Sequence, residues 1–216
     1  MKKTIVLVVL FALPIVAYLF FASGVNTFAK LPVVTAGINE LPDWETLSGK
    51  EIILKDKITI LGFPGDSVLY NKGNAFNLSQ KIYNKNREFT DFQVVMIAPE
   101  GTEAQAKELI ASLERINDMS GWHFVFAPHQ EIQEFYNSLQ LVGNLDSNYG
   151  TPNVFIIDKD LNLRGRKGKN IKGEEEYKEG YNTISAADLH NEMADDVKII
   201  LAEYRLALKK NNKREI

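Results

Sequence analysis

The sequence predicts an α/β domain in which helices flank a central mixed sheet, preceded by one N-terminal transmembrane helix. Short apolar runs alternate with amphipathic segments between residues 57 and 139, which is typical of strands that alternate with helices. Two adjacent strands and a long final helix complete the order, and such an order places helices on both faces of a sheet. The length of 216 residues fits one domain plus a short extra segment.

The N-terminal segment 4–22 is apolar almost throughout. About 19 residues are enough to cross roughly 30 Å of hydrocarbon, and Lys2 and Lys3 favour an N-terminus in the cytoplasm. A cleaved signal peptide is the alternative, because small residues at 22–24 and 27–29 offer cleavage sites. We expect a membrane anchor here, with the residues before it, 1–3, in the cytoplasm and the rest of the chain outside it.

Residues 23–45 carry two prolines and little periodicity, which predicts a tether and an N-terminal extension. The domain is expected over residues 46–208, with a polar tail at 209–216. Its expected strands are short apolar runs bounded by turn residues, at 51–54, 57–62, 92–98 and 122–127. Its expected helices repeat apolar residues at helical spacing, at 74–85, 103–116 and 130–139.

The ends of two helices carry capping signals. Thr102 and Gln105 have the spacing of a capping box, in which the hydroxyl accepts a hydrogen bond from the third helical N–H and the glutamine reaches back. Ser185 and Asp188 are expected to cap the final helix. The segment 164–181, a run of basic residues followed by acidic ones, is expected to be a solvated loop.

A buried strand is expected to begin at Thr151-Pro152 and to run to Asp158. Proline cannot donate to a central ladder, so it belongs at the first residue of such a strand, where the preceding bond can be cis. Pro152 is therefore a candidate for a structural cis-proline. A second strand is expected at 161–166, with the final helix after it.

Composition excludes some classes of function. The net charge is −3 and the pI is about 5.7, which gives no electrostatic basis for binding nucleic acid. The chain has no cysteine, so it offers no thiol for disulfide exchange or nucleophilic catalysis. No serine-hydrolase, zinc-protease or phosphate-loop motif is present. We expect no enzymatic activity and no cofactor.

The order of elements, the expected anchor and three local strings resemble the Sco/SenC family, the membrane-tethered thioredoxin-like copper chaperones of cytochrome c oxidase assembly. The strings lie at 57–63, 155–160 and 195–201, and the resemblance spans about residues 31–208. It implies a thioredoxin-like fold for the domain. It also implies a bacterial inner-membrane protein with a single span and a periplasmic domain.

The family binds copper through two cysteines in a C-x-x-x-C loop and one histidine. Counted along the matching strings, the cysteine positions fall near Asp66 and Tyr70 and the histidine position falls at Gly150. All three ligands are missing. Thiolates are the soft donors that hold Cu(I), and aspartate or tyrosine is a poor substitute. The chain resembles a divergent member without cysteines, and we do not carry over the family's metal site or redox activity.

Two functions remain open. The first is a non-catalytic binding or assembly module, with a role in respiratory oxidase biogenesis, that docks a protein partner through Asp66, Leu69, Tyr70, Thr151 and Pro152. These residues are expected to meet at the carboxyl ends of the central strands, where ligands of open α/β sheets usually bind. The alternative is a copper carrier with non-cysteine ligands, although the candidate donors are far apart in the sequence: His123, His129, His190, Met96, Met119 and Met193.

Overall fold

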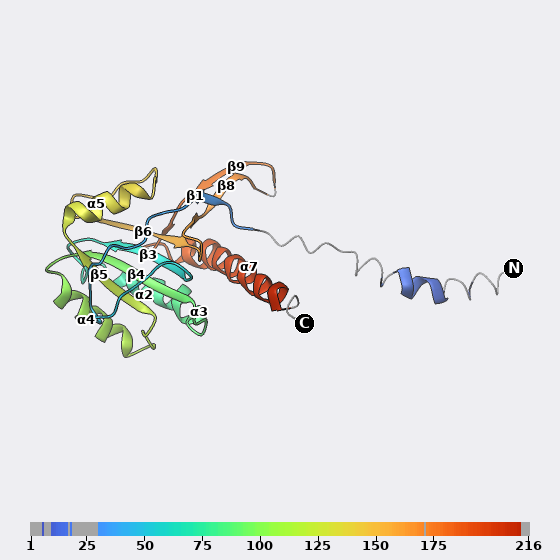
Figure 1. The fold of residues 1–216 in the computed structure, drawn as a ribbon, viewed down its shortest axis with the longest axis horizontal. Helices are drawn as coiled ribbons and strands as arrows, with labels where there is room; N and C mark the ends of the chain where they lie inside the picture. Colours follow the sequence, from blue (N-terminus) through green and yellow to red (C-terminus); the bar gives the residue numbers. More distant parts are fainter. Residues whose placement is uncertain (1–5, 7–9, 17, 19–29, 171, 213–216) are drawn as a thin grey trace.

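The computed structural model describes residues 6, 10–16, 18, 30–170 and 172–212, and Figure 1 shows its fold. Within those residues, no helix is both long enough and apolar enough to span a membrane. The expected anchor at 4–22 lies mostly outside the described residues, and so does the end of the expected tail, 213–216.

A mixed sheet forms the centre of the domain, as the sequence predicts. Its parallel strands are β3 (Ile58–Pro64), β4 (Phe92–Pro99) and β5 (Trp122–Ala127), and β6 (Gly150–Ile157) runs antiparallel beside β3. The short strands β7 (Leu163–Arg164) and β1 (Val33–Thr35) form one edge, and β2 (Glu45–Thr46) forms the other. A further short strand, β10 (Tyr181–Asn182), pairs with β6 outside this path.

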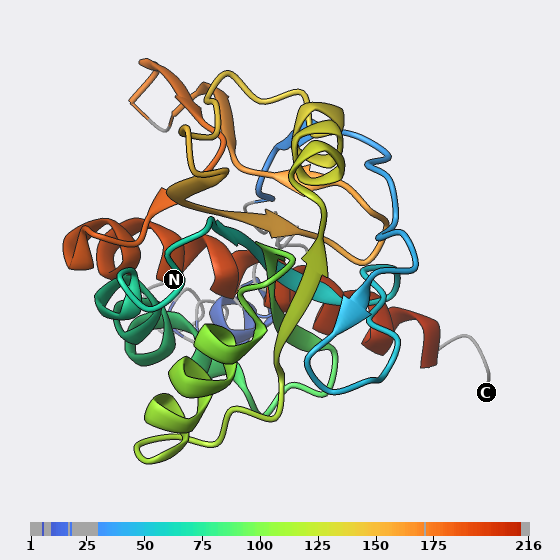
Figure 2. The ribbon, with the colours of Figure 1, turned by 90° about the vertical axis from the view of Figure 1, so that its left-hand side faces the viewer.

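Helices cover both faces of the sheet, and Figure 2 shows this arrangement from the end where α4 and α5 begin. One face carries α5 (His129–Ser138). The other carries α4 (Glu103–Glu114) and two helices interrupted by π-helical turns. The first of these two comprises α2 (Lys72–Leu78), η1 (Ser79–Tyr83) and α3 (Asn84–Asn86), and the second comprises α6 (Ala186–Asp188), η2 (Leu189–Met193) and α7 (Ala194–Asn212).

Alternation along the strands separates the two halves of the core. Ile58 and Ile60 of β3 lie in the cluster with α2, α4 and α7, whereas Leu61 and Phe63 lie in the cluster with α5. Successive side chains of a strand point to opposite faces, so one apolar run serves both layers. The largely apolar character of 58–63 is thus typical of a strand that is covered on both faces.

Residues 51–54 do not form the strand that their apolar character predicts. The Glu40 carboxylate accepts hydrogen bonds from Leu54 N at 2.7 Å and from Lys55 N at 2.8 Å. Leu54 is fully buried in the α5 side of the core. The segment is thus held by one buried side chain and one carboxylate, and a strand ladder is not needed to satisfy these N–H groups.

The predicted capping box at Thr102 is wrong. Thr102 is the N-cap of α4, but its hydroxyl donates to the Pro99 carbonyl oxygen at 2.7 Å and makes no cap bond to the helix. Gln105 turns away to the loop after β3, as described below. At the final helix Ser185 does cap, because its hydroxyl accepts from Asp188 N at 3.1 Å. Asp188 does not cap, and its carboxylate accepts from Asn182 N at 2.7 Å.

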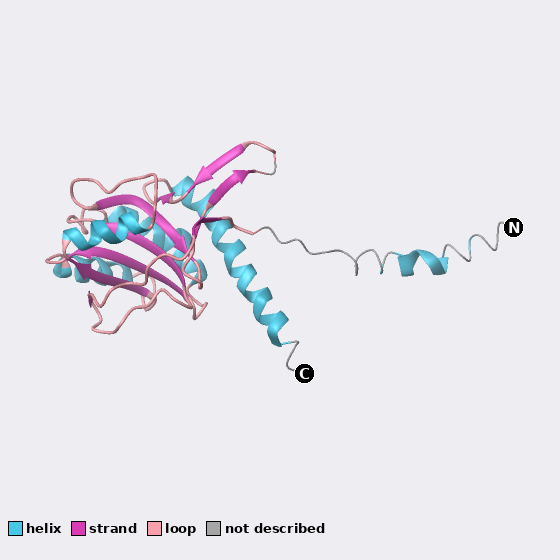
Figure 3. Ribbon diagram, turned by 45° about the horizontal axis from the view of Figure 1, so that its top comes forward, coloured by secondary structure: helices cyan, strands magenta, loops and turns pink. Residues whose placement is uncertain are grey.

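The segment 164–181 is not a solvated loop. It contains a hairpin of β8 (Arg166–Lys169) and β9 (Glu175–Lys178), which Figure 3 shows projecting from the body near the start of the described domain. Charge composition misled the prediction, because half of the cations in this segment form ion pairs with carboxylates of the last helix.

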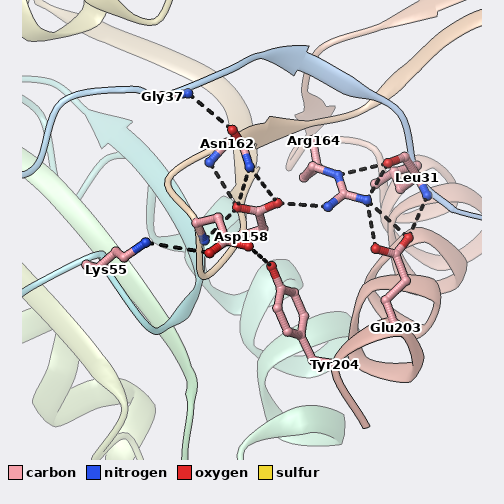
Figure 4. Close-up of polar contacts among 9 residues, drawn as sticks. Leu31, Gly37, Lys55, Asp158, Asn162, Arg164, Glu203 and Tyr204 are labelled. Atoms are coloured by element: carbon pink, nitrogen blue, oxygen red, sulfur yellow. Dashed lines mark hydrogen bonds and ion pairs between the residues drawn. The ribbon is translucent and has the colours of Figure 1, made fainter. Parts of the chain in front are cut away.

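Arg164 lies at the point where the chain enters the domain, and Figure 4 shows its contacts. Its guanidinium donates to Asp158 Oδ2 at 2.8 Å, to Glu203 Oε2 at 2.9 Å and to the Leu31 carbonyl oxygen at 2.8 Å. Leu31 N in turn donates to Glu203 Oε1 at 3.1 Å. Burial alone would lower the pKa of Arg164, but the hydrogen bonds to Asp158 and Glu203 raise it above its ordinary value. We call these four residues the tether junction.

Candidate docking site

The loop after β3 lies against the start of β6. Phe63 pairs with Thr151 and Pro64 pairs with Gly150 across the two strands. Gly65 follows with a φ of +68°, and a Cβ atom there would lie 2.5 Å from the Asn148 carbonyl oxygen. Only glycine fits this contact without moving backbone. The close approach brings the loop and β6 together at the carboxyl end of β3.

We use the term docking site for the loop 63–72 together with Thr151 and Pro152. The structure places the three positions matched to copper ligands, Asp66, Tyr70 and Gly150, at this one end of the sheet. Asp66 N donates to the Asn148 carbonyl oxygen at 3.0 Å, beside Gly150. The three counted positions therefore lie close together, and their role as a site stays a prediction.

Pro152 is not a cis-proline, because no peptide bond of the described residues is cis. The register between β3 and β6 shifts after Gly62, which pairs with Val154 while Phe63 pairs with Thr151. Pro152 thus lies in a β-bulge, where its missing N–H removes no ladder bond. Its carbonyl oxygen accepts from Thr183 N at 2.9 Å and from the Thr183 hydroxyl at 2.7 Å. The bulge therefore forms with a trans bond between Thr151 and Pro152.

The loop is less exposed than its sequence suggested. Val68 is fully buried and Leu69 is half-buried against the α2–α4–α7 side of the core, whereas the aromatic side chain of Tyr70 has 90% of its surface exposed. Gln105 of α4 fixes this arrangement by accepting from Leu69 N at 3.3 Å and donating to the Asp66 carbonyl oxygen at 3.2 Å. Leu69 is therefore less exposed than expected, because its side chain packs partly against the core, and its role as a contact stays a prediction.

His129, which the sequence analysis names only as a candidate copper donor, lies in the site. His129 Nε2 at the start of α5 is 2.6 Å from Asp66 Oδ1, and both side chains are about half exposed. The His129 ring also packs on Tyr149 with ring centroids 4.3 Å apart. The only sequence signal was the position of each residue directly after a buried strand, because β3 and β5 end at the same edge of the sheet.

A surface pocket of about 330 Å³ opens between the loop and β6. Tyr70, Ser67 and Asp146 line it together with the backbone of Gly150. Asp146 Oδ1 accepts from Asn148 N at 2.8 Å and from Gly150 N at 2.9 Å, so this wall is held by its own hydrogen bonds. The site offers an exposed aromatic ring beside a polar pocket, which suits a small protein interface.

The alternative of a metal carrier gains no support from the geometry. Within the described part of the chain, no group of three or more histidine, aspartate or glutamate side chains could hold a metal ion. His123 lies on β5 and His190 on η2, whereas His129 begins α5. Met96, Met119 and Met193 are buried core residues.

Comparisons with known proteins support the fold. No family model and no curated protein matches the sequence. Among solved structures, BsSco, a member of the Sco family of cytochrome c oxidase assembly proteins, matches with a TM-score of 0.55 and 14% identity, over 79% of this chain and 95% of that chain. The fold is thioredoxin-like. A protein provisionally described as a protein disulfide isomerase from Bacteroides thetaiotaomicron matches with a TM-score of 0.54 and 10% identity, over 81% of this chain and 95% of that one.

These neighbours confirm the resemblance to Sco proteins at the level of the fold. Identities this low show the fold alone, because unrelated functions share folds of this kind. The sequence departs from thiol proteins in having no cysteine.

Proposed function

We propose that the protein is a membrane-anchored, extracytoplasmic Sco-like domain that acts as a non-catalytic binding or assembly module. The docking site contacts a protein partner, and respiratory oxidase biogenesis is the process to test first. The observation that carries the proposal is the exposed Tyr70 ring on a loop that Gly65, Gln105 and Asn71 hold in one shape. A preorganised loop loses little conformational entropy on binding, which favours use as an interface.

The location follows from the expected anchor at 4–22, with the domain on the periplasmic side of a bacterial inner membrane. The fold supports this reading through its likeness to a Sco-family assembly protein. Nothing in the docking site supplies a nucleophile with a bound base in the pattern of a catalytic triad. The His129–Asp66 pair instead joins the start of α5 to the loop, and it supports the shape of the site from one side.

A photo-activated cross-linking residue in place of Tyr70 tests the proposal in intact cells. We expect one dominant cross-linked partner that is absent when the residue replaces Ile116, an exposed apolar side chain after α4. In the protein without the cross-linking residue, Tyr70→Asp should abolish co-purification of that partner with little change in stability, since exposed substitutions usually shift stability by about 0.5 kcal/mol or less.

Ile116→Asp is the matched control, because it places the same charge on another exposed apolar position. Equal partner capture by Tyr70→Asp, Ile116→Asp and the unchanged protein would refute the docking site. A partner from respiratory oxidase assembly would support the process, and an unrelated exported protein would leave the interface in place while removing the oxidase link.

A further inference from the structure

The β8–β9 hairpin has two faces of different electrostatic character. One face points to the helices, and each of its cations is matched by carboxylates. Arg166 Nε donates to Asp196 Oδ2 at 2.8 Å, and its NH1 group is 3.0 Å from Glu176 Oε1. Lys178 forms ion pairs with Asp188 and Glu192. Charge on this face is therefore satisfied within the protein.

The same contacts hold the hairpin in place. The buried Tyr181 hydroxyl, just after β9, donates to Asp196 Oδ2 at 2.6 Å, the oxygen that also receives Arg166. Burial raises the pKa of Tyr181, and the Asp196 charge raises it further, so the phenol keeps its proton. The hairpin is thus a fixed projection from the body.

The opposite face carries cations that are not matched. Lys167 and Lys169 lie on the face of β8 opposite to Arg166, and both are exposed. Within the described residues, neither is in an ion pair, and the same holds for Lys172 in the hairpin turn and Lys30 at the chain's entrance. Glu174 and Glu175 partly offset this charge and leave a surplus of two positive charges among these six side chains.

An exposed aromatic side chain completes this outer face. Tyr177 pairs across the hairpin with Lys167 and has 51% of its surface exposed. Tyrosine is enriched where proteins meet the lipid–water boundary, and lysine extends its ammonium to the headgroups from the same depth. A surface pocket of about 500 Å³ lies beside the face, and its lining combines Lys30 and the hairpin lysines with the acidic side chains Glu176, Asp195 and Asp196.

The hairpin lies at the end of the domain where the chain enters. Gly165 N donates to the Pro32 carbonyl oxygen at 3.0 Å, and Val33 pairs with Arg164. Figure 1 shows the hairpin, the start of β1 and the end of α7 on one side, with α4 and α5 beginning on the other. Lys209 and Lys210 belong to the last turns of α7.

We propose that the outer face of the β8–β9 hairpin, with Lys30, binds the anionic phospholipid headgroups of the membrane that holds the protein. The inference rests on the membrane attachment put forward under the proposed function. Each lysine near an anionic bilayer surface contributes about 1 kcal/mol, or about fivefold in the ratio of docked to undocked domain. The contact orients the domain on the bilayer.

The absence of cysteine allows a direct test with the full chain in vesicles. A nitroxide on Glu175→Cys reports from the hairpin, and one on Glu100→Cys, after β4, reports from the opposite end. The vesicles contain phosphatidylcholine with added phosphatidylglycerol, and a paramagnetic relaxation agent is attached to some lipid headgroups. We expect this agent to speed the spin relaxation of the hairpin label alone. The signal should fall in pure phosphatidylcholine and at high salt, because added ions shorten the Debye length.

Lys167→Gln/Lys169→Gln should lower the docked ratio by about fivefold for each lysine. Lys50→Gln/Lys107→Gln is the control with the same charge change on two exposed lysines elsewhere, and it should leave the ratio unchanged. A hairpin label that stays free of lipid in inserted protein, or equal losses in both double variants, would overturn the inference alone. Full chain that does not float with vesicles would overturn the membrane attachment and this inference together.

Discussion

Single long-range contacts set the shape of the docking site. Gly65 and Gly150 let two backbone segments touch, Gln105 holds the loop from α4, and His129 reaches Asp66 from α5. None of these contacts is local in sequence. A residue-by-residue reading could therefore place Asp66 and Tyr70 near β6 by counting, but it could not find the residues that support them.

The Gly65 contact gives a matched pair of substitutions. Gly65→Ala should destabilise the protein by more than the roughly 1 to 2 kcal/mol that a left-handed conformation costs an L-residue, because its Cβ would also meet the Asn148 carbonyl oxygen. Gly37 has a φ of +63°, and a Cβ atom there would have no other atom within 4 Å. Gly37→Ala should therefore show the conformational cost alone. Denaturant unfolding of both variants measures the difference. Equal losses would show that the loop gives way freely.

His123 should make stability depend on pH. Its ring is half-buried on β5, and burial, then the charge of Lys57, lowers its pKa below the ordinary value of 6.5. The unfolded chain therefore binds the proton more readily than the folded one, so stability should fall as pH drops through the ordinary pKa toward the folded pKa. His123→Gln should flatten this part of the profile. A slope that persists unchanged in unfolding experiments at several pH values would assign it to other groups.

The sequence predicted the secondary-structure elements correctly where they are buried on both faces. The central strands were predicted to within two residues at each end, because apolar runs bounded by turn residues have few other uses. The prediction failed where a side chain forms the hydrogen bond in place of the expected partner. The Glu40 carboxylate accepts from Leu54 N, and the Thr102 hydroxyl donates to the Pro99 carbonyl oxygen. It also failed at the β8–β9 hairpin, where Arg166 and Lys178 form ion pairs with residues of the last helix.

The tether junction yields a prediction at this scale. Arg164→Met should cost about 3 to 5 kcal/mol, because it leaves the buried Asp158 carboxylate and the largely buried Glu203 without their cation. Arg164→Met/Asp158→Asn should recover part of that loss, since one uncompensated charge is then removed. Thermal or denaturant unfolding gives both values. A single variant as stable as the unchanged protein would show that solvent readily replaces the guanidinium.

At the scale of the whole molecule, the attachment of the chain to a membrane is the open prediction. We expect full-length protein in the membrane fraction, resistant to alkaline carbonate, with an intact mass that includes residues 1–22. Replacing Lys2 and Lys3 by glutamate is a useful companion, because it should disturb the orientation of the domain without altering its fold. Recovery of a soluble form that begins near residue 25 or 30 would identify a cleaved signal peptide instead.

The tether junction and the docking site lie at opposite ends of β3. β6 runs antiparallel to β3, so Ile157 and the strands after it sit beside Thr59, while Gly150 sits beside Pro64. A domain held in a membrane at the tether junction would present Tyr70 to the aqueous side, above that junction by about the length of β3, roughly 3.3 Å for each of its 7 residues. A membrane partner with only short loops would not reach that level. The partner is therefore expected to have a folded domain of similar height, or to arrive from the aqueous compartment.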